Sequence, residues 1–133
     1  MVVCVQICII DDQPNITKPL ALLLQYHGFG VTVYHNGLDA LQGLDRCEHL
    51  PAVIVVDYMM PVMDGFEFRK RQKATPRIAD IPTFLFTASA AHIANPGIGF
   101  DLQLQKPISA KDLVATIKTF FGSLPESVSQ PCL

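Results

Sequence analysis

The chain has 133 residues, enough for one domain with a substantial core, and the hydrophobic fraction of 50% excludes a disordered chain. The formal net charge of -2 gives no indication of binding to nucleic acid or to an anionic membrane surface. The apolar run at residues 1–10 is too short to cross a membrane and lacks the basic start of a signal peptide, and the four cysteines lack metal-binding spacing, so we expect a cytoplasmic protein with reduced thiols.

The first part of the chain predicts a strand followed by a helix. A β-branched, apolar run predicts the strand over residues 2–10. The helix should begin near residue 14 and end at Gly28, with a kink at Pro19 unless this residue lies in the first turn. Its apolar residues with helical spacing are Ile16, Leu20, Leu23 and Leu24.

A second strand and helix follow, and then a third strand. The second strand is predicted over residues 31–34, and Asn36 is the expected N-cap of a helix that runs to about residue 46. The residues expected to face inward from this helix are Leu38, Leu41 and Leu44. Residues 52–56 are all apolar and include three valines, which predicts a strand buried on both faces that ends on the carboxylate of Asp57.

The next segment predicts one long and one short helix around a fourth strand. A turn at residues 64–65 precedes a helix over residues 66–72, and the strand over residues 83–86 ends in Thr87. A brief helix is expected over residues 88–94.

The last part of the chain predicts a strand, a helix and a tail. The strand over residues 102–105 ends in Lys106, and the final helix is capped by Ser109 and ended by Gly122. Its expected inner stripe consists of Leu113, Ile117, Phe120 and Phe121. Residues 123–133 are rich in serine and proline and are expected to form a loose tail.

Five strands alternating with five helices predict an α/β fold whose parallel sheet is covered on both faces. In such sheets ligands bind beyond the carboxyl ends of the strands, so the residues at these ends should converge. They are Asp11, Asp12, Asp57, Thr87 and Lys106. Clustered carboxylates favour a hard cation such as Mg²⁺, and a hydroxyl with an ammonium suits a phosphoryl group, which an aspartate can accept as a nucleophile.

These motifs resemble the receiver domains of two-component response regulators, of the kind found in chemotaxis regulators. The matching segments, in the family's order, are residues 11–12, 36–37, 40–41, 57 with 60–61, 64–65, 87–88 and 106–107. The resemblance implies a flavodoxin-like, doubly wound five-stranded parallel sheet with strand order 2-1-3-4-5 and five helices. It also implies a receiver domain over residues 1–122, followed by the tail.

The resemblance assigns the central roles. Asp57 would be the phosphoacceptor, and Lys106 would pair with the phosphoryl group. Mg²⁺ would be bound by Asp12, Asp57 and the backbone carbonyl of Met59, with Asp11 acting through a water molecule. Thr87 would turn inward to bond the phosphoryl group and so switch the conformation.

The resemblance also assigns secondary roles. Met59 and Ser89 occupy the positions that tune dephosphorylation, and the Lys106–Pro107 peptide should be cis. Gln103 occupies the position where the family usually has an aromatic switch residue, so the usual coupling of an aromatic rotamer to the threonine is in question.

The expected partners are a histidine kinase or histidine phosphotransfer protein and, downstream, a protein that binds the face formed by residues 88–94, the strand at 102–105 and the last helix. Neither nucleic acid nor a membrane is expected as a partner. One alternative is a degenerate receiver that only binds other proteins. Another is a Mg²⁺-dependent phosphotransferase of the haloacid dehalogenase type, but Met59 stands where that family needs a second aspartate. We therefore expect that the chain is not an enzyme and that its own activity is at most slow self-dephosphorylation.

Overall fold

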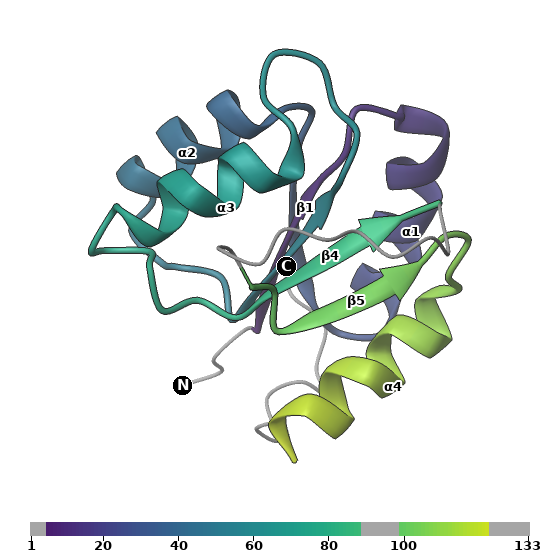
Figure 1. Ribbon diagram of the computed structural model, residues 1–133. Helices are drawn as coiled ribbons and strands as arrows, with labels where there is room; N and C mark the ends of the chain where they lie inside the picture. Colours follow the sequence, from purple (N-terminus) through teal and green to yellow (C-terminus); the bar gives the residue numbers. More distant parts are fainter. Residues whose placement is uncertain (1–4, 89–98, 123–133) are drawn as a thin grey trace.

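The computed structural model describes residues 5–88 and 99–122 (Figure 1). They form a five-stranded sheet in the order β2-β1-β3-β4-β5, in which every neighbouring pair of strands is parallel. The strands are β1 (Gln6–Ile10), β2 (Gly30–Tyr34), β3 (Val53–Asp57), β4 (Thr83–Thr87) and β5 (Leu102–Gln105). The expected strand order is confirmed.

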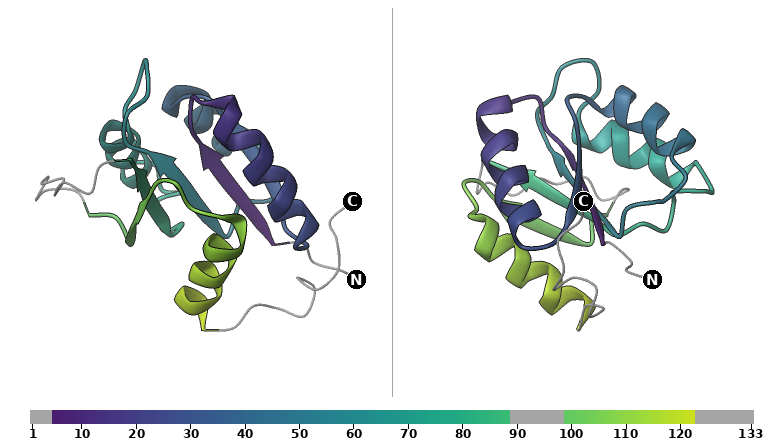
Figure 2. Two further views of the ribbon diagram at one scale, coloured as in Figure 1. Left: turned by 90° about the vertical axis from the view of Figure 1, so that its right-hand side faces the viewer. Right: turned by 180° about the vertical axis from the view of Figure 1, so that it is seen from behind.

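The described residues contain four helices, which cover both faces of the sheet (Figures 1 and 2). They are α1 (Pro14–Tyr26), α2 (Gly37–Arg46), α3 (Gly65–Lys73) and α4 (Ala110–Phe121). The brief helix expected over residues 88–94 and the expected loose tail lie outside the described residues, apart from Ala88. Within the described part of the chain, every helix is too short or too polar to span a bilayer.

The alternation of side chains along the strands creates two separate cores. On β1, Ile7 and Ile9 pack on one face with α1 and α4, whereas Cys8 and Ile10 pack on the other face with α2 and α3. The same alternation holds along β3, since successive side chains of a strand point to opposite faces of its sheet. A strand apolar at every position therefore fits a sheet covered on both sides.

Two helices begin at the capping residues that the sequence predicts, and a third begins at a residue predicted only as part of a turn. The side chain of Asn36 accepts a hydrogen bond from the Asp39 amide at 2.8 Å, and Ser109 does the same for Asp112 at 3.0 Å. Asp64 caps α3 by accepting from the amide of Glu67. Because these side chains satisfy amides that have no partner inside the helix, they set where each helix begins.

Two inward-facing assignments are wrong. Leu38 and Leu23 are exposed, although the spacing predicted that both face the core. On α2 the buried positions are Gly37, Ala40 and Leu44, which places Leu38 about 100° to the side. On α1 the apolar residues surround most of the helix, so spacing alone does not identify the inner face, and a threonine, Thr17, occupies part of it.

Other expectations need smaller corrections. The first described strand starts at Gln6, and residues 2–4 of the expected strand lie outside the described residues. Helix α1 continues through Pro19 to Tyr26. Pro19 removes the hydrogen bond that the Asn15 carbonyl would receive, and both residues are exposed, so water can solvate that carbonyl. Phe120 and Phe121, which were expected to face inward, are as exposed as Leu38, although the ring of Phe120 still lies 5.1 Å from that of the buried Phe84.

A buried polar side chain, Gln72, ties α3 to the segment that leads into β4. Its amide nitrogen donates to the carbonyls of Ile78 at 3.0 Å and Ile81 at 3.1 Å. Its amide oxygen accepts from the Arg69 guanidinium at 2.9 Å and from the Thr83 hydroxyl at 3.0 Å. Gln72 thus makes all its hydrogen bonds inside the protein.

We expect Gln72→Leu to lower the free energy of unfolding by about 3 kcal/mol, because leucine fills the space but leaves buried donors and acceptors unpaired. Urea unfolding followed by circular dichroism measures this change. The control is Lys73→Leu, at the exposed neighbouring position, which should change stability by about 0.5 kcal/mol or less. Equal stability of the two variants would contradict the structural role of Gln72.

Candidate functional site

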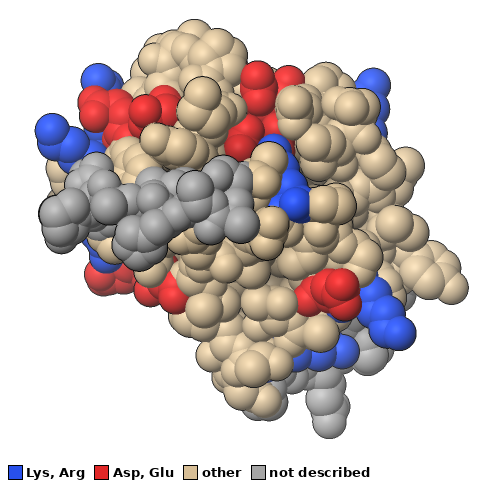
Figure 3. Space-filling model, turned by 45° about the vertical axis from the view of Figure 1, so that its right-hand side comes forward, with Lys and Arg blue, Asp and Glu red and all other residues tan. Residues whose placement is uncertain are grey.

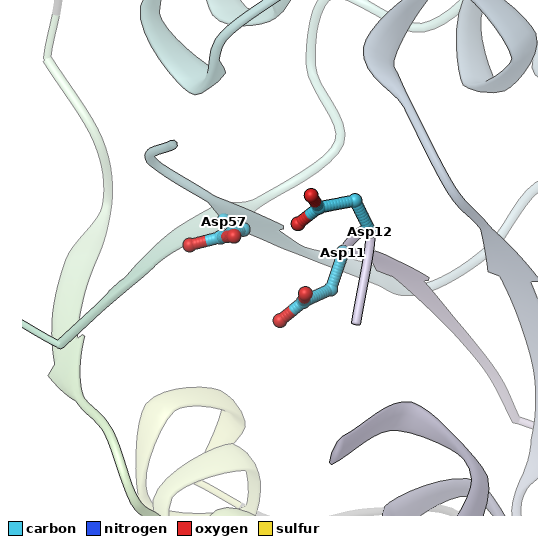
Figure 4. A group of neighbouring side chains, drawn as sticks. All are labelled: Asp11, Asp12 and Asp57. Atoms are coloured by element: carbon cyan, nitrogen blue, oxygen red, sulfur yellow. The ribbon is translucent and has the colours of Figure 1, made fainter. Parts of the chain in front are cut away.

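The polar residues at the strand ends meet at one edge of the sheet. Asp11 and Asp12 follow β1, Asp57 is the last residue of β3, and one carboxylate oxygen from each lies within 4.8 Å of the others. Figure 4 shows that the three carboxylates come from two neighbouring strands and lie around a common space. The site is therefore a consequence of strand order, since β1 and β3 are adjacent and parallel.

Lys106, which follows β5, brings a positive charge to the carboxylates. Its ammonium lies 2.7 Å from Oδ2 of Asp11 and 3.3 Å from Oδ1 of Asp57, and it donates to the amide oxygen of Gln13 at 3.5 Å. The ammonium also lies 5.1 Å from the centre of the Phe86 ring. These contacts hold the lysine side chain directly beside the carboxylate of Asp57.

The backbone around Lys106 links β5 to the end of β4. The Lys106 amide donates to the carbonyl of Thr87 at 2.7 Å, so the two residues lie side by side. The Lys106–Pro107 peptide is cis, in agreement with the expectation. Thr87 is buried at the end of β4. The chain thus delivers a hydroxyl-bearing and an ammonium-bearing residue to the same strand ends.

Burial and neighbouring charges raise the pKa of Asp57. Burial is the largest cause, repulsion from Asp11 is the next, and attraction to Lys106 opposes them. Asp12 adds a smaller repulsion. The single ammonium of Lys106 therefore does not compensate for the burial of Asp57 and for the neighbouring negative charges. A further positive charge at the site would stabilise the ionised carboxylate of Asp57.

The loop after β3 folds back tightly on Asp57. The Gly65 amide donates to the carbonyl of Tyr58 at 2.9 Å, and a Cβ atom at Gly65 would lie only 2.5 Å from the Asp57 carbonyl oxygen. Val62 has a φ of 71°, and the Met63 amide bonds back to the Pro61 carbonyl, which is a tight three-residue turn. A glycine is thus required where α3 starts close to the acidic site.

The donor set fits a hard cation such as Mg²⁺. Three carboxylates supply only oxygen atoms, which Mg²⁺ prefers. Within the described residues, the buried Oδ2 atom of Asp11 receives no hydrogen bond of normal geometry, although Lys106 lies close to it. An acidic oxygen without such a bond, in a cluster with excess negative charge, is suited to a cation or to water bound by one.

The remaining predicted residues lie at varying distances from the cluster. Met59 is in the loop after β3 with an exposed side chain, and Gln103 is exposed on β5, where it pairs with Leu85. Ser89 lies outside the described residues. Gln103 is thus part of the edge strand rather than of the carboxylate cluster.

Gln13 and His35 contact the site but received no role in the sequence analysis. The Gln13 amide nitrogen in the backbone donates to Oδ1 of Asp11 at 3.0 Å, and Nδ1 of His35 lies 3.3 Å from the Asp11 carbonyl oxygen. The position of Gln13 directly after the acidic pair was a signal that could have identified it. His35 follows β2, and only the pairing of β2 with β1 brings it to Asp11.

Comparisons with known proteins agree with this geometry. Residues 7–118 match the family described as response regulator receiver domain. A "Transcriptional regulatory protein CpxR homolog" from Haemophilus influenzae is 32% identical over 116 residues, which cover 85% of this chain and 48% of that protein. An "Uncharacterized 14.6 kDa protein" from Leptolyngbya boryana is 32% identical over 122 residues, covering 90% and 92%. The chain thus spans about half the length of the first relative and most of the second.

Solved structures have the same fold. A putative response regulator from Chloroflexus aurantiacus has a TM-score of 0.80 at 27% identity, covering 90% of this chain and 99% of that chain. The receiver domain of a sensor histidine kinase from Pseudomonas aeruginosa, whose structure has a magnesium ion coordinated in the active site cleft, has a TM-score of 0.79 at 22% identity, covering 91% and 100%.

Proposed function

Since this chain belongs to the response regulator receiver domain family, we propose that its Asp57 accepts a phosphoryl group from a histidine kinase or a histidine phosphotransfer protein. The observation that carries the proposal is the position of Lys106, whose ammonium lies between Asp11 and Asp57 at the end of the sheet. A receiver needs a nucleophilic carboxylate with a cation beside it, and this pair provides both.

In the proposed reaction, a carboxylate oxygen of Asp57 forms a bond to phosphorus while the bond from phosphorus to the donor's imidazole nitrogen breaks. The electron pair of that bond returns to the imidazole ring, and the product is an aspartyl phosphate on this chain. Lys106 would offset the negative charge on the transferring group. The chain is thus the acceptor of a group transfer, and its own chemistry would be limited to slow self-dephosphorylation.

Mg²⁺ belongs to the proposal. Asp12, Asp57 and the backbone carbonyl of Met59 would hold the ion directly, and Asp11 would contact it through a water molecule. When bound, the ion supplies positive charge that counters the repulsion between the carboxylates and the incoming phosphoryl oxygens. The arrangement of Asp11, Asp12 and Asp57 within 4.8 Å supports this set of ligands.

We further propose that phosphorylation changes the surface around β5 and α4 through Thr87. Its hydroxyl would turn to bond the phosphoryl group, and its backbone hydrogen bond with Lys106 supports a shared movement of the two strand ends. A downstream protein would recognise the changed face of the segment after Thr87, β5 and α4, with neither nucleic acid nor membrane as its target. Met59 and Ser89 would tune the rate at which the aspartyl phosphate is hydrolysed.

The proposal includes the receiver at residues 1–122, the tail at residues 123–133 and a cytoplasmic location. Among the described residues, Cys8 and Cys47 form no disulfide, which favours a reducing compartment. The degenerate receiver remains a second candidate, because Gln103 replaces the family's usual aromatic residue. Phosphorylation of Asp57 separates the two candidates.

The test is to incubate the full chain with a small phosphodonor and Mg²⁺, trap the adduct by borohydride reduction, and locate it by mass spectrometry. We expect a single modified residue, Asp57. Modification elsewhere, or none under conditions that phosphorylate an established receiver, would contradict the proposal and favour the degenerate alternative.

Gln103→Ala is expected to leave phosphorylation by a small donor within about twofold of wild type, because the side chain is exposed on β5 and away from the carboxylate cluster. The rate of phosphorylation, followed by the trapped adduct, measures this. Gln105→Ala, at an exposed position on the same strand, is the matched control. A tenfold loss in Gln103→Ala alone would mean that Gln103 acts in the site itself.

A further inference from the structure

Gln13 lies on the solvent side of the charged groups at the sheet edge. Its side-chain oxygen accepts a hydrogen bond from the Lys106 ammonium at 3.5 Å, and its backbone amide donates to Oδ1 of Asp11 at 3.0 Å. The side chains of Lys106 and Asp11 have exposed fractions of only 9% and 1%, whereas Gln13 is exposed. The ammonium therefore lies between a buried carboxylate and an exposed amide oxygen.

The start of α1 indicates that the Gln13 side chain is not used for capping. Each of the other three helices in the described residues begins after a residue whose side chain accepts a hydrogen bond from a backbone amide of the first turn. Gln13 is the N-cap of α1, but within the described part of the chain its side chain makes no such bond. Glutamine is not among the residues that usually cap a helix, so asparagine would suit this position better if only the helix mattered.

The position of the ammonium matters because the two carboxylates beside it lie at different distances. Its nitrogen is 2.7 Å from Oδ2 of Asp11 and 3.3 Å from Oδ1 of Asp57. The attraction of Asp11 draws the ammonium toward the buried side, away from the solvent from which a phosphoryl group arrives. Figure 3 shows acidic and basic side chains that adjoin within a largely uncharged surface. An acceptor on the solvent side, such as the Gln13 oxygen, opposes the attraction of Asp11.

We propose that Gln13 is a positioning residue for phosphoryl transfer, whose amide oxygen holds the Lys106 ammonium on the solvent side of the carboxylates, where it meets the incoming phosphoryl oxygens. An amide is neutral, so it orients the ammonium without competing strongly with the negatively charged phosphoryl group. A carboxylate at this position would compete, and it would add a further negative charge to Asp11, Asp12 and Asp57. The inference rests on the proposed phosphoacceptor function.

The rate of phosphorylation of the full chain, with acetyl phosphate as the small phosphodonor and Mg²⁺, tests the proposal. Gln13→Met keeps the length of the side chain but removes the acceptor, and we expect it to slow phosphorylation about three- to tenfold, as the loss of one hydrogen bond implies. Gln13→Glu should also slow it, because the carboxylate retains the ammonium. Asn15→Met is the matched control, since Asn15 is exposed and lines the same groove as Gln13 and Lys106, and it should stay within about twofold of wild type.

Gln13→Asn separates the positioning of Lys106 from a role at the start of α1. Asparagine is a better N-cap than glutamine, so this variant should be at least as stable as wild type in thermal unfolding. Its side chain is one methylene shorter, so the amide oxygen would not reach Lys106, and phosphorylation should slow as it does in Gln13→Met. A wild-type rate of phosphorylation in either variant would overturn the inference, because the contact with Lys106 would then have no effect on the reaction.

A second measurement observes the lysine directly and needs no phosphoryl transfer. In metal-free protein with isotope-labelled lysine, the Nζ resonance of Lys106, assigned by its loss in Lys106→Arg, should move in Gln13→Met and stay unchanged in Asn15→Met. A wild-type chain that is not phosphorylated would contradict the proposed function. If wild type is phosphorylated, an unchanged Lys106 resonance in Gln13→Met would overturn this inference alone.

Discussion

Asp57→Asn is expected to reduce phosphoryl incorporation from a small donor to less than about 1% of wild type, because an amide lacks the nucleophilic carboxylate oxygen. The substitution keeps the shape of the side chain and removes a charge whose burial is unfavourable, so the fold should persist. The measurement is the amount of trapped aspartyl-phosphate adduct formed over time. Circular dichroism checks that the variant is folded.

Asp64→Asn is the matched control for this result. Asp64 is an exposed carboxylate seven residues further on, and it caps α3, a role that asparagine fulfils about as well. Asp64→Asn should therefore incorporate as much phosphoryl group as wild type. If Asp57→Asn also incorporated as much as wild type, another residue would accept the phosphoryl group, and the proposed function would be wrong.

Removal of Mg²⁺ is expected to destabilise wild type, and Asp12→Asn is expected to lose most of this response. At ten to a hundred times its dissociation constant, a ligand that binds only the folded chain adds about 1.4 to 2.7 kcal/mol. Without metal, Asp12→Asn should be as stable as wild type or slightly more stable. The gain is small because the repulsion between Asp12 and Asp57 is the smallest of the causes that raise the pKa of Asp57. Thermal unfolding with and without Mg²⁺ measures both effects.

The pH dependence gives an independent check. A carboxylate whose pKa is raised by folding binds more protons in the folded state, so its contribution to stability is lost as pH rises from about 3.9, the unfolded value, through the raised folded value. Metal-free wild type should therefore lose stability over this range more steeply than Asp57→Asn. Asp45→Asn, which removes an exposed carboxylate on α2, should respond to Mg²⁺ and pH as wild type does. If Mg²⁺ stabilises Asp12→Asn and wild type equally, Asp12 is not a ligand.

The convergence of the polar residues could be predicted because it depends on strand order and on side chains at strand ends. Asp11 follows and Asp57 ends a buried apolar run, whereas Lys106 follows the alternating edge strand β5, and parallel strands bring all three ends to one edge. The pKa of Asp57 is raised mainly by burial and only secondarily by repulsion from the neighbouring carboxylates, and the depth of burial depends on the folded loops rather than on the order of the strands. The roles of these residues remain predictions until phosphorylation is measured.

The predictions that failed concern contacts that the spacing of apolar residues does not reveal. Leu23 was placed inside because it has helical spacing with Leu20, yet α1 has apolar residues on nearly every side, and the buried Thr17 gave no signal. Gln72 looked like an ordinary polar residue at a helix end. Its burial depends on how residues 78–83 fold over α3, which is a property of a loop rather than of a repeating pattern.

The sheet separates two hydrophobic cores that share strands but not side chains, one beneath α1 and α4 and the other beneath α2 and α3. Substitutions in one core should then combine additively with substitutions in the other, since additivity holds for residues without shared neighbours. The α1 side could accordingly be redesigned, by selection or by an engineer, to change which protein is recognised. The core beneath α2 and α3, which includes Met63 from the loop after Asp57, could stay unchanged and so keep the geometry of the acidic site.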